Sequence, residues 1–198
     1  MMENKQRLDI RKEVREFVRE ECRKEDAKYK EAFENHFKPA VKYSKELAEE
    51  LGADKEVVVI AAWLHDIGSI IEGRKNHHLT GKRIAEKKLK ELGYPEDKLE
   101  KVKKCILNHR GSKEDKNKRD FIEAQIITEA DAISAFDDLA GLFNAALVYE
   151  GKGLEEARES VIEKLENKWN QLSLEVSKKI IKPKYEAVKL LLNKKSIK

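Results

Sequence analysis

Histidines and carboxylates in the first two thirds of the chain follow an order that suits metal binding. The doublet His65-Asp66 directly follows the most continuously hydrophobic segment, 57–64, so we expect both residues at the end of a buried helix. A carboxylate there is costly to desolvate unless a cation or several hydrogen-bond donors meet it. Imidazole nitrogens and carboxylate oxygens together suit zinc, manganese, iron or nickel, and such ligands with one open position can activate water. All five histidines fall at expected helix ends or junctions: His36, His65, His77, His78 and His109.

The segments around the doublet have clear helix signals. Asp54 is a good N-cap for the helix that ends at His65-Asp66, and we expect Gly68 to break that helix. A further helix opens at Thr80-Gly81, so His77 and His78 immediately precede it. The expected elements therefore bring the histidines to the ends of neighbouring helices.

The rest of the chain has the three- and four-residue spacing of amphipathic helices, and no period-two alternation is present. Asp131 lies in one of these helices, with Ile127 one turn before it and Ala135 one turn after it, so we expect it on the inward face. Pro183 should kink or break the last helix, which Ser173 can cap. The other expected helices cover residues 6–23, 26–37, 38–51, 95–109, 121–136, 139–148 and 154–172.

Composition limits the class of protein. A chain of 198 residues fits one domain, with a motif-bearing core at about 30–136 and a helical extension at about 137–198. Lysine and arginine (42) nearly balance aspartate and glutamate (38), and the interleaved signs argue against a nucleic-acid partner. Neither a signal segment nor a stretch of about 20 apolar residues is present, so we expect a soluble protein without a membrane partner. Two cysteines in apolar helical patterns suit the reducing cytoplasm.

The order of these residues resembles the HD-domain superfamily of metal-dependent phosphohydrolases. The pattern of that family is a histidine, a later His-Asp doublet and a still later aspartate, each on a different helix. The matching residues here are His36, His65-Asp66 in WLHDIG, and Asp131 in ITEADAIS. The resemblance runs from about residue 36 to 136 and implies an all-α HD-domain helical bundle with additional N- and C-terminal helices. It also implies that these four residues hold a divalent metal.

Many two-metal members of this family have two further histidines between the doublet and the last aspartate. His77 matches the first, since Gly81 follows it by four residues, and His109 matches the second. His78 is an equally plausible candidate for the first position. With two metals, Asp66 would bridge them. The resemblance therefore implies one or two ions of Mn, Zn, Ni, Fe or Mg.

The activity implied by the resemblance is hydrolysis of a phosphomonoester or phosphodiester, with a nucleotide as one candidate, by metal-activated water. His65 and Asp66 would be catalytic through the metal. Relatives often carry an arginine soon after the first histidine, where this chain has Lys38-Pro39. Four cations close in sequence to the ligands could neutralise phosphate charge: Lys38, Arg74, Lys82 and Arg110.

Two other functions fit parts of the same pattern. A mixed-valent di-iron oxygenase of HD fold uses the same ligands, but it needs all six of them and iron. A non-catalytic ligand-binding module would keep the fold with a broken ligand set, whereas the set here is intact. Simpler structural roles exist for single residues, such as a buried pair for His65-Asp66, a helix C-cap for His109 and a polar loop for His77 and His78. The expected partner is a small phosphorylated substrate, and a homo-oligomer is left open.

Overall fold

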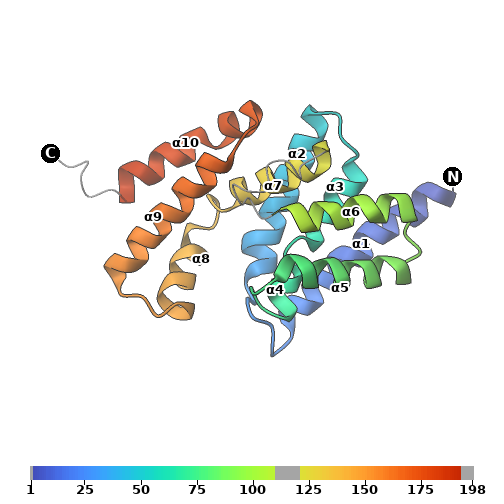
Figure 1. The fold of residues 1–198 in the computed structure, drawn as a ribbon, viewed down its shortest axis with the longest axis horizontal. Coiled ribbons are helices and arrows are strands. Elements are labelled where there is room, and N and C mark those ends of the chain that lie inside the picture. Colours follow the sequence, from blue (N-terminus) through green and yellow to red (C-terminus); the bar gives the residue numbers. More distant parts are fainter. Residues whose placement is uncertain (1, 110–120, 193–198) are drawn as a thin grey trace. The chain divides into compact units, whose positions relative to one another are not determined.

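The computed structural model describes residues 2–109 and 121–192 (Figure 1), so Arg110 lies outside the described residues. Every regular element in these two ranges is helical, which confirms the predicted all-α class. The chain divides into two compact units, one that ends at Thr128 and one that begins at Glu129. Each unit is described by itself, and a single domain over residues 1–198 stays a prediction.

The first unit is built around one buried helix, α3. This helix packs against α1, α2 and α6, while α5 packs against both α4 and α6. All residues from 57 to 64 of α3 are buried, as the hydrophobic run predicts. The elements of this unit are α1 (Met2–Arg23), the π-helical turn η1 (Phe33–Phe37), α2 (Lys38–Glu50), α3 (Lys55–Leu64), α4 (Ile67–Ile71), α5 (His77–Glu91), α6 (Glu96–Asn108) and the first part of α7 (Ile122–Ser134).

The start of α3 is fixed by the predicted cap. One carboxylate oxygen of Asp54 accepts hydrogen bonds from the backbone N–H groups of Glu56 (3.0 Å) and Val57 (3.2 Å). The other oxygen lies 2.8 Å from Nζ of Lys98, which belongs to α6. Burial raises the pKa of Asp54, but the hydrogen bonds from Lys98 and from the backbone bring it below its usual value. The cap therefore also ties α3 to α6.

Gly68 does not end a helix, which corrects the prediction. It lies inside α4, and a Cβ atom there would be 2.3 Å from the carbonyl oxygen of His77 and 2.7 Å from the backbone nitrogen of Gly81. The chain turns at His65-Asp66 instead, because α3 ends at Leu64. The glycine is needed because the backbones of α4 and α5 touch at this point. Local sequence signals cannot reveal such a contact.

Two other predicted helix boundaries are wrong. The segment 26–37 forms a helical turn only over Phe33–Phe37, and the N–H of Lys28 donates instead to the distant carbonyl of Ile70 at 3.1 Å. The helix α5 begins at His77 and not at Thr80. Asn76 precedes it in the left-handed region, at φ 57°, and its carbonyl accepts the N–H of Thr80. His77 is therefore a residue of the first helical turn.

The second unit contains the rest of α7 with α8 (Leu139–Asn144), the π-helical turn η3 (Ala145–Tyr149), α9 (Leu154–Gln171) and α10 (Glu175–Leu192). The helices α9 and α10 lie side by side and are joined by a short turn (Figure 1). Ser173 lies in this turn. Its N–H (2.7 Å) and its hydroxyl (2.8 Å) donate hydrogen bonds to Oε1 of Glu129, which belongs to α7. The helix α10 continues through Pro183, so the expected break is absent.

Within the described ranges, no single helix is long and apolar enough to cross a bilayer. One pair of helices separated by a bend, Ile122–Ser134 with Leu139–Tyr149, passes that test together on length and composition alone. Cys22 and Cys105 are free thiols and are buried, as their apolar helical patterns predict.

Candidate metal centre

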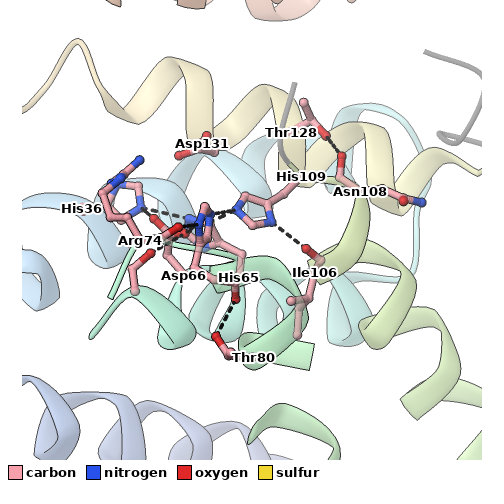
Figure 2. Close-up of polar contacts among 12 residues, drawn as sticks. His36, His65, Asp66, Arg74, Thr80, Ile106, Asn108, His109, Thr128 and Asp131 are labelled. Atoms are coloured by element: carbon pink, nitrogen blue, oxygen red, sulfur yellow. Dashed lines mark hydrogen bonds and ion pairs between the residues drawn. The ribbon is translucent and has the colours of Figure 1, made fainter. Parts of the chain in front are cut away.

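Four histidines of the first unit lie around the carboxylate of Asp66; Figure 2 labels three of them, His36, His65 and His109. Oδ1 of Asp66 lies 3.1 Å from Nε2 of His77 and 3.3 Å from Nε2 of His109, and these two nitrogens are 3.2 Å apart. Oδ2 lies 3.4 Å from Nε2 of His36, which is 2.9 Å from Nε2 of His65. The carboxylate therefore joins two pairs of imidazole nitrogens.

Helix ends position all of these side chains, as the sequence predicts. His36 lies on η1, the His65-Asp66 doublet forms the turn between α3 and α4, His77 is the first residue of α5, and His109 directly follows α6. Because α3 packs on α6, α6 on α5 and α5 on α4, the ends of these helices can converge on one point. The histidines are far apart in the sequence, at separations of 29 residues for His36 and His65 and 32 for His77 and His109.

The first part of α7 is anchored in the same unit. Oε1 of Glu123 accepts the backbone N–H of Asp54 at 3.2 Å, and the hydroxyl of Thr128 donates to the carbonyl of Asn108 at 3.3 Å. Asn108 directly precedes His109. Glu123 also has the capping-box spacing from Asp120, which lies outside the described residues. Glu123 thus holds the start of α3, while Thr128 holds the end of α6.

The second ring nitrogen of three histidines faces a backbone carbonyl three residues earlier in the chain. The Nδ1 atoms donate to carbonyl oxygens in the pairs His65 to Ala62 (2.7 Å), His77 to Arg74 (2.8 Å) and His109 to Ile106 (2.6 Å). A carbonyl can only accept, so Nδ1 carries the proton, and in the neutral ring the lone pair is on Nε2. This is the arrangement that supports a metal-binding histidine.

The close contacts between Nε2 atoms suit a bound cation. If a proton bridged Nε2 of His77 and Nε2 of His109, which lie 3.2 Å apart, one of the two rings would carry a proton on both nitrogens and would be an imidazolium ion. A divalent metal could instead be held by both lone pairs together with one oxygen of Asp66. Asp66, His77 and His109 form such a group, with ligand atoms within 4.8 Å of one another. A set rich in imidazole suits zinc, manganese, iron or nickel better than magnesium, which prefers oxygen ligands.

Asp66 remains ionised in this environment. Burial raises its pKa, but in the absence of a metal the imidazoles of His109, His36 and His77, when they are protonated at Nε2, together with the charge of a protonated His65, lower it well below the usual range. The hydroxyl of Ser69 lies 3.3 Å from Oδ1. The carboxylate is thus available as a metal ligand.

The structure discriminates between the two adjacent histidines. His77 is buried and belongs to the cluster, whereas His78 is half-buried and its ring centroid lies 6.0 Å from that of His77. Successive residues on a helix point about 100° apart, so only one of the two can face Asp66. The geometry favours His77 for the position that the sequence left open.

The described cations that we expected near phosphate have different surroundings. Nζ of Lys38 lies close to a carboxylate oxygen of Glu34 and above the ring of Phe33. Arg74 is exposed, and its contribution to the cluster is the carbonyl that accepts from His77. Lys82 is half-buried on α5. Contacts of these side chains with phosphate stay predictions.

Asp131 belongs to the second unit and lies on α7, which is one continuous helix from Ile122 to Ser134. Within that unit, its Oδ2 lies 2.6 Å from Nζ of Lys168 on α9. Its role as a metal ligand stays a prediction from the sequence order.

Sequence reasoning missed several residues that support these side chains. The carbonyls of Ala62, Arg74 and Ile106 were not predicted, although each lies three residues before its histidine and that spacing is visible in the sequence. Ser69 has the same three-residue spacing from Asp66. No sequence signal connects Lys168 with Asp131, which are 37 positions apart.

The fold and the cluster define an all-helical protein with a histidine- and aspartate-rich site that could hold a metal. Residues 33–135 match the family model described as "HD domain", which is more than half of the 198 residues. The chain therefore belongs to the HD domain family, which confirms the resemblance predicted from its motifs.

Sequence relatives share only part of the chain. An uncharacterised protein from Clostridium beijerinckii is 36% identical over 90 residues, which cover 44% of this chain and 54% of that protein. Ribonuclease Y from Mycoplasma capricolum is 42% identical over 96 residues, and that from Mycoplasma mycoides is 41% identical over 96 residues. Each match covers 48% of this chain and 16% of the ribonuclease. The chain thus spans about half of the first relative and a small part of the others.

A solved structure shares the fold over a longer range. The crystal structure of the Lin1889 protein from Listeria innocua matches with a TM-score of 0.69 and 17% sequence identity, and the match covers 94% of this chain and 93% of that one. At this identity the likeness concerns the fold alone.

Proposed function

We propose that this HD-domain protein is a metal-dependent phosphohydrolase that cleaves a phosphomonoester or phosphodiester. The observation that carries the proposal is the approach of two imidazole Nε2 atoms to one oxygen of Asp66, at 3.1 Å and 3.3 Å, with both Nδ1 atoms bound to carbonyls. A donor set of this kind fits a catalytic metal site.

In this proposal the residues around Asp66 hold one or two divalent ions. Asp66, His77 and His109 would hold one ion, and His36 and His65 would contribute to a second. Sequence order in the family assigns Asp131 to the same ligand set. A divalent ion supplies Lewis acidity, which lowers the pKa of a bound water and neutralises phosphate charge.

The residues of the chain orient the metal-binding imidazole rings and exclude bulk water from the site. The carbonyls that accept from Nδ1 fix the rings of His65, His77 and His109, so their Nε2 atoms need little reorganisation when they bind an ion. These rings are almost fully buried, with exposed fractions of 1%, 4% and 3%. Burial keeps bulk water away, which strengthens the electrostatic interactions of the site.

The test is hydrolysis of chromogenic phosphomonoester and phosphodiester substrates, and of mononucleotides, by protein loaded separately with Mn, Zn, Ni, Fe or Mg. We expect turnover with at least one of these ions and its loss in Asp66→Asn. Asp97→Asn, an exposed aspartate of α6, is the matched control and should keep turnover. Circular dichroism should show equal helicity in the three proteins.

Two results would overturn the proposal. Iron-dependent oxygen uptake without phosphoester hydrolysis would identify an oxygenase. Metal binding without turnover on any of these substrates, together with tight binding of an uncleaved nucleotide, would identify a ligand-binding module.

A further inference from the structure

A groove of about 700 Å³ lies on the first unit, where residues of α1 and α2 face each other above α3. Both α1 and α2 pack on α3, so α3 forms the floor. Six basic residues line the groove, and one carboxylate, Glu46, accompanies them. The basic residues are Arg11, Lys12 and Arg15 of α1 and Lys38, Lys42 and Lys45 of α2.

Described carboxylates do not neutralise most of this charge. Among the side chains that the structure describes, Lys38 has an ion pair, with Glu34, and the other five cations of the groove have none. On α5 and α6, by comparison, three lysines pair with glutamates: Lys90 with Glu86, Lys98 with Glu56 and Lys103 with Glu100. The groove is therefore a local excess of positive charge in a chain with nearly balanced totals.

The spacing of the cations places like charges beside one another. Arg11 and Arg15 are four residues apart on α1, and Lys42 follows Lys38 by four residues on α2. Like charges at this spacing lie on the same face of a helix and destabilise it. An anionic ligand that binds across both helices would relieve this repulsion.

The floor of the groove is apolar and rigid. Val41, Val59 and Trp63 are buried, with exposed fractions of 4%, 5% and 6%. The Trp63 ring stacks on Phe33 with centroids 5.4 Å apart and an angle of 17° between the rings. The groove thus offers charge along its sides and apolar contact at its base, and this floor has no polar group that could read one base.

The length of the basic row suits a chain of phosphates. At about 1.5 Å per residue, Lys38 to Lys45 spans about 10 Å along α2. Phosphates recur every few ångströms along a nucleic acid backbone, so a row of this length can contact more than one consecutive phosphate. Among the described residues, none of the large exposed hydrophobic side chains lines the groove, which argues against a membrane surface as the ligand.

We propose that this groove binds a single strand of nucleic acid through its phosphodiester backbone. The cations of α1 and α2 contact successive phosphates, and the apolar floor contacts sugars and bases without selecting a sequence. The binding goes beyond the proposed phosphohydrolase activity and needs no metal.

The test is fluorescence anisotropy of labelled oligouridylate and oligothymidylate with the full chain, measured over a series of salt concentrations. The groove variant is Lys42→Glu/Lys45→Glu. The control is Lys87→Glu/Lys104→Glu, which changes two exposed lysines of α5 and α6 by the same charge. All four lysines are exposed, so both variants should keep the fold, which circular dichroism verifies.

We expect the groove variant to bind at least tenfold more weakly than the control. Loss of two phosphate contacts should also reduce the slope of log K against log salt by about 1.4, because each contact on a single strand contributes about 0.7. Hydrolysis of a small chromogenic phosphodiester should be the same in the two variants.

Three outcomes would overturn the proposal. The first is equal binding by the two double variants. The second is equally tight, equally groove-dependent binding of polyglutamate, which would identify an acidic protein segment as the ligand. The third is dimerisation that the groove variant abolishes, which would show that a second copy of the chain covers the groove.

Discussion

Replacement of Gly68 by alanine should damage the metal centre without replacing any of its ligands. A Cβ atom at this position would lie 2.3 Å from the carbonyl oxygen of His77, 2.5 Å from Oγ1 of Thr80 and 2.7 Å from the backbone nitrogen of Gly81. The hydroxyl can rotate away, but two of these atoms belong to the α5 backbone. Ordinary contact requires about 3.4 Å, so α4 and α5 must separate by about 1 Å.

The cost follows from two opposing effects. Overpacking of a tight interface costs about 1–3 kcal/mol, and alanine gains up to about 1 kcal/mol over glycine inside a helix. We therefore expect Gly68→Ala to lower the free energy of unfolding by about 1–2 kcal/mol. Gly81→Ala is the matched control, since its Cβ would find its nearest neighbours at 3.4 Å and 3.5 Å. The control should be as stable as the wild type or slightly more stable.

The displacement should also reach the site, because His77 begins the helix that must move. Metal ligands tolerate deviations of about 0.2 Å, so a movement near 1 Å should weaken metal binding about 10- to 100-fold. The assays are urea denaturation in the presence of a chelator, which isolates packing from metal binding, and metal titration of each variant. A Gly68→Ala protein with wild-type stability and wild-type metal affinity would refute this account of how α4 and α5 position the site.

Three further predictions concern single residues. His109→Ala should remove one metal equivalent and spare another, as measured by elemental analysis. An unchanged number of metal equivalents per chain would show that His109 only caps its helix. Lys168→Met should weaken metal binding about 10- to 100-fold if Lys168 orients Asp131 as a ligand, with partial rescue in Lys168→Arg; equal affinity of all three proteins in metal titrations would exclude that role. Asp54→Ala should cost about 1 kcal/mol at neutral pH through loss of the α3 cap. Because the pKa of Asp54 is lowered in the folded protein, the stabilisation exists above about pH 4 and is lost as the pH falls through the lowered value. Urea denaturation of this variant at several pH values should therefore show a flatter acid dependence, and a curve parallel to that of the wild type would contradict the reasoning.

The sequence predicts helix ends well where the determinants are local. The hydrophobic run 57–64 and the cap at Asp54 define α3 by themselves, so the doublet at its end was found correctly. His109 was likewise expected at the end of its helix. These positions depend on neighbouring residues only, and periodicity and capping are sufficient to predict them.

Features that depend on distant parts of the chain could not be predicted. The N–H of Lys28 bonds to the carbonyl of Ile70, which competes with a helix over 26–32. Gly68 was predicted to break a helix. The glycine is required instead by its contact with the α5 backbone, which can be seen only in the folded structure. The same holds for the choice of His77 over His78, which depends on where α5 begins. Nearly balanced charge totals also gave no sign that the cations of α1 and α2 share one groove.

The most direct test of the central claim is elemental analysis of protein purified without a histidine tag and without chelator, compared with Asp66→Asn. The account predicts one or two equivalents of a divalent transition metal per chain in the wild type and a clear loss in the variant. A wild-type protein that holds no metal after incubation with each candidate ion, or a variant with unchanged stoichiometry, would contradict it.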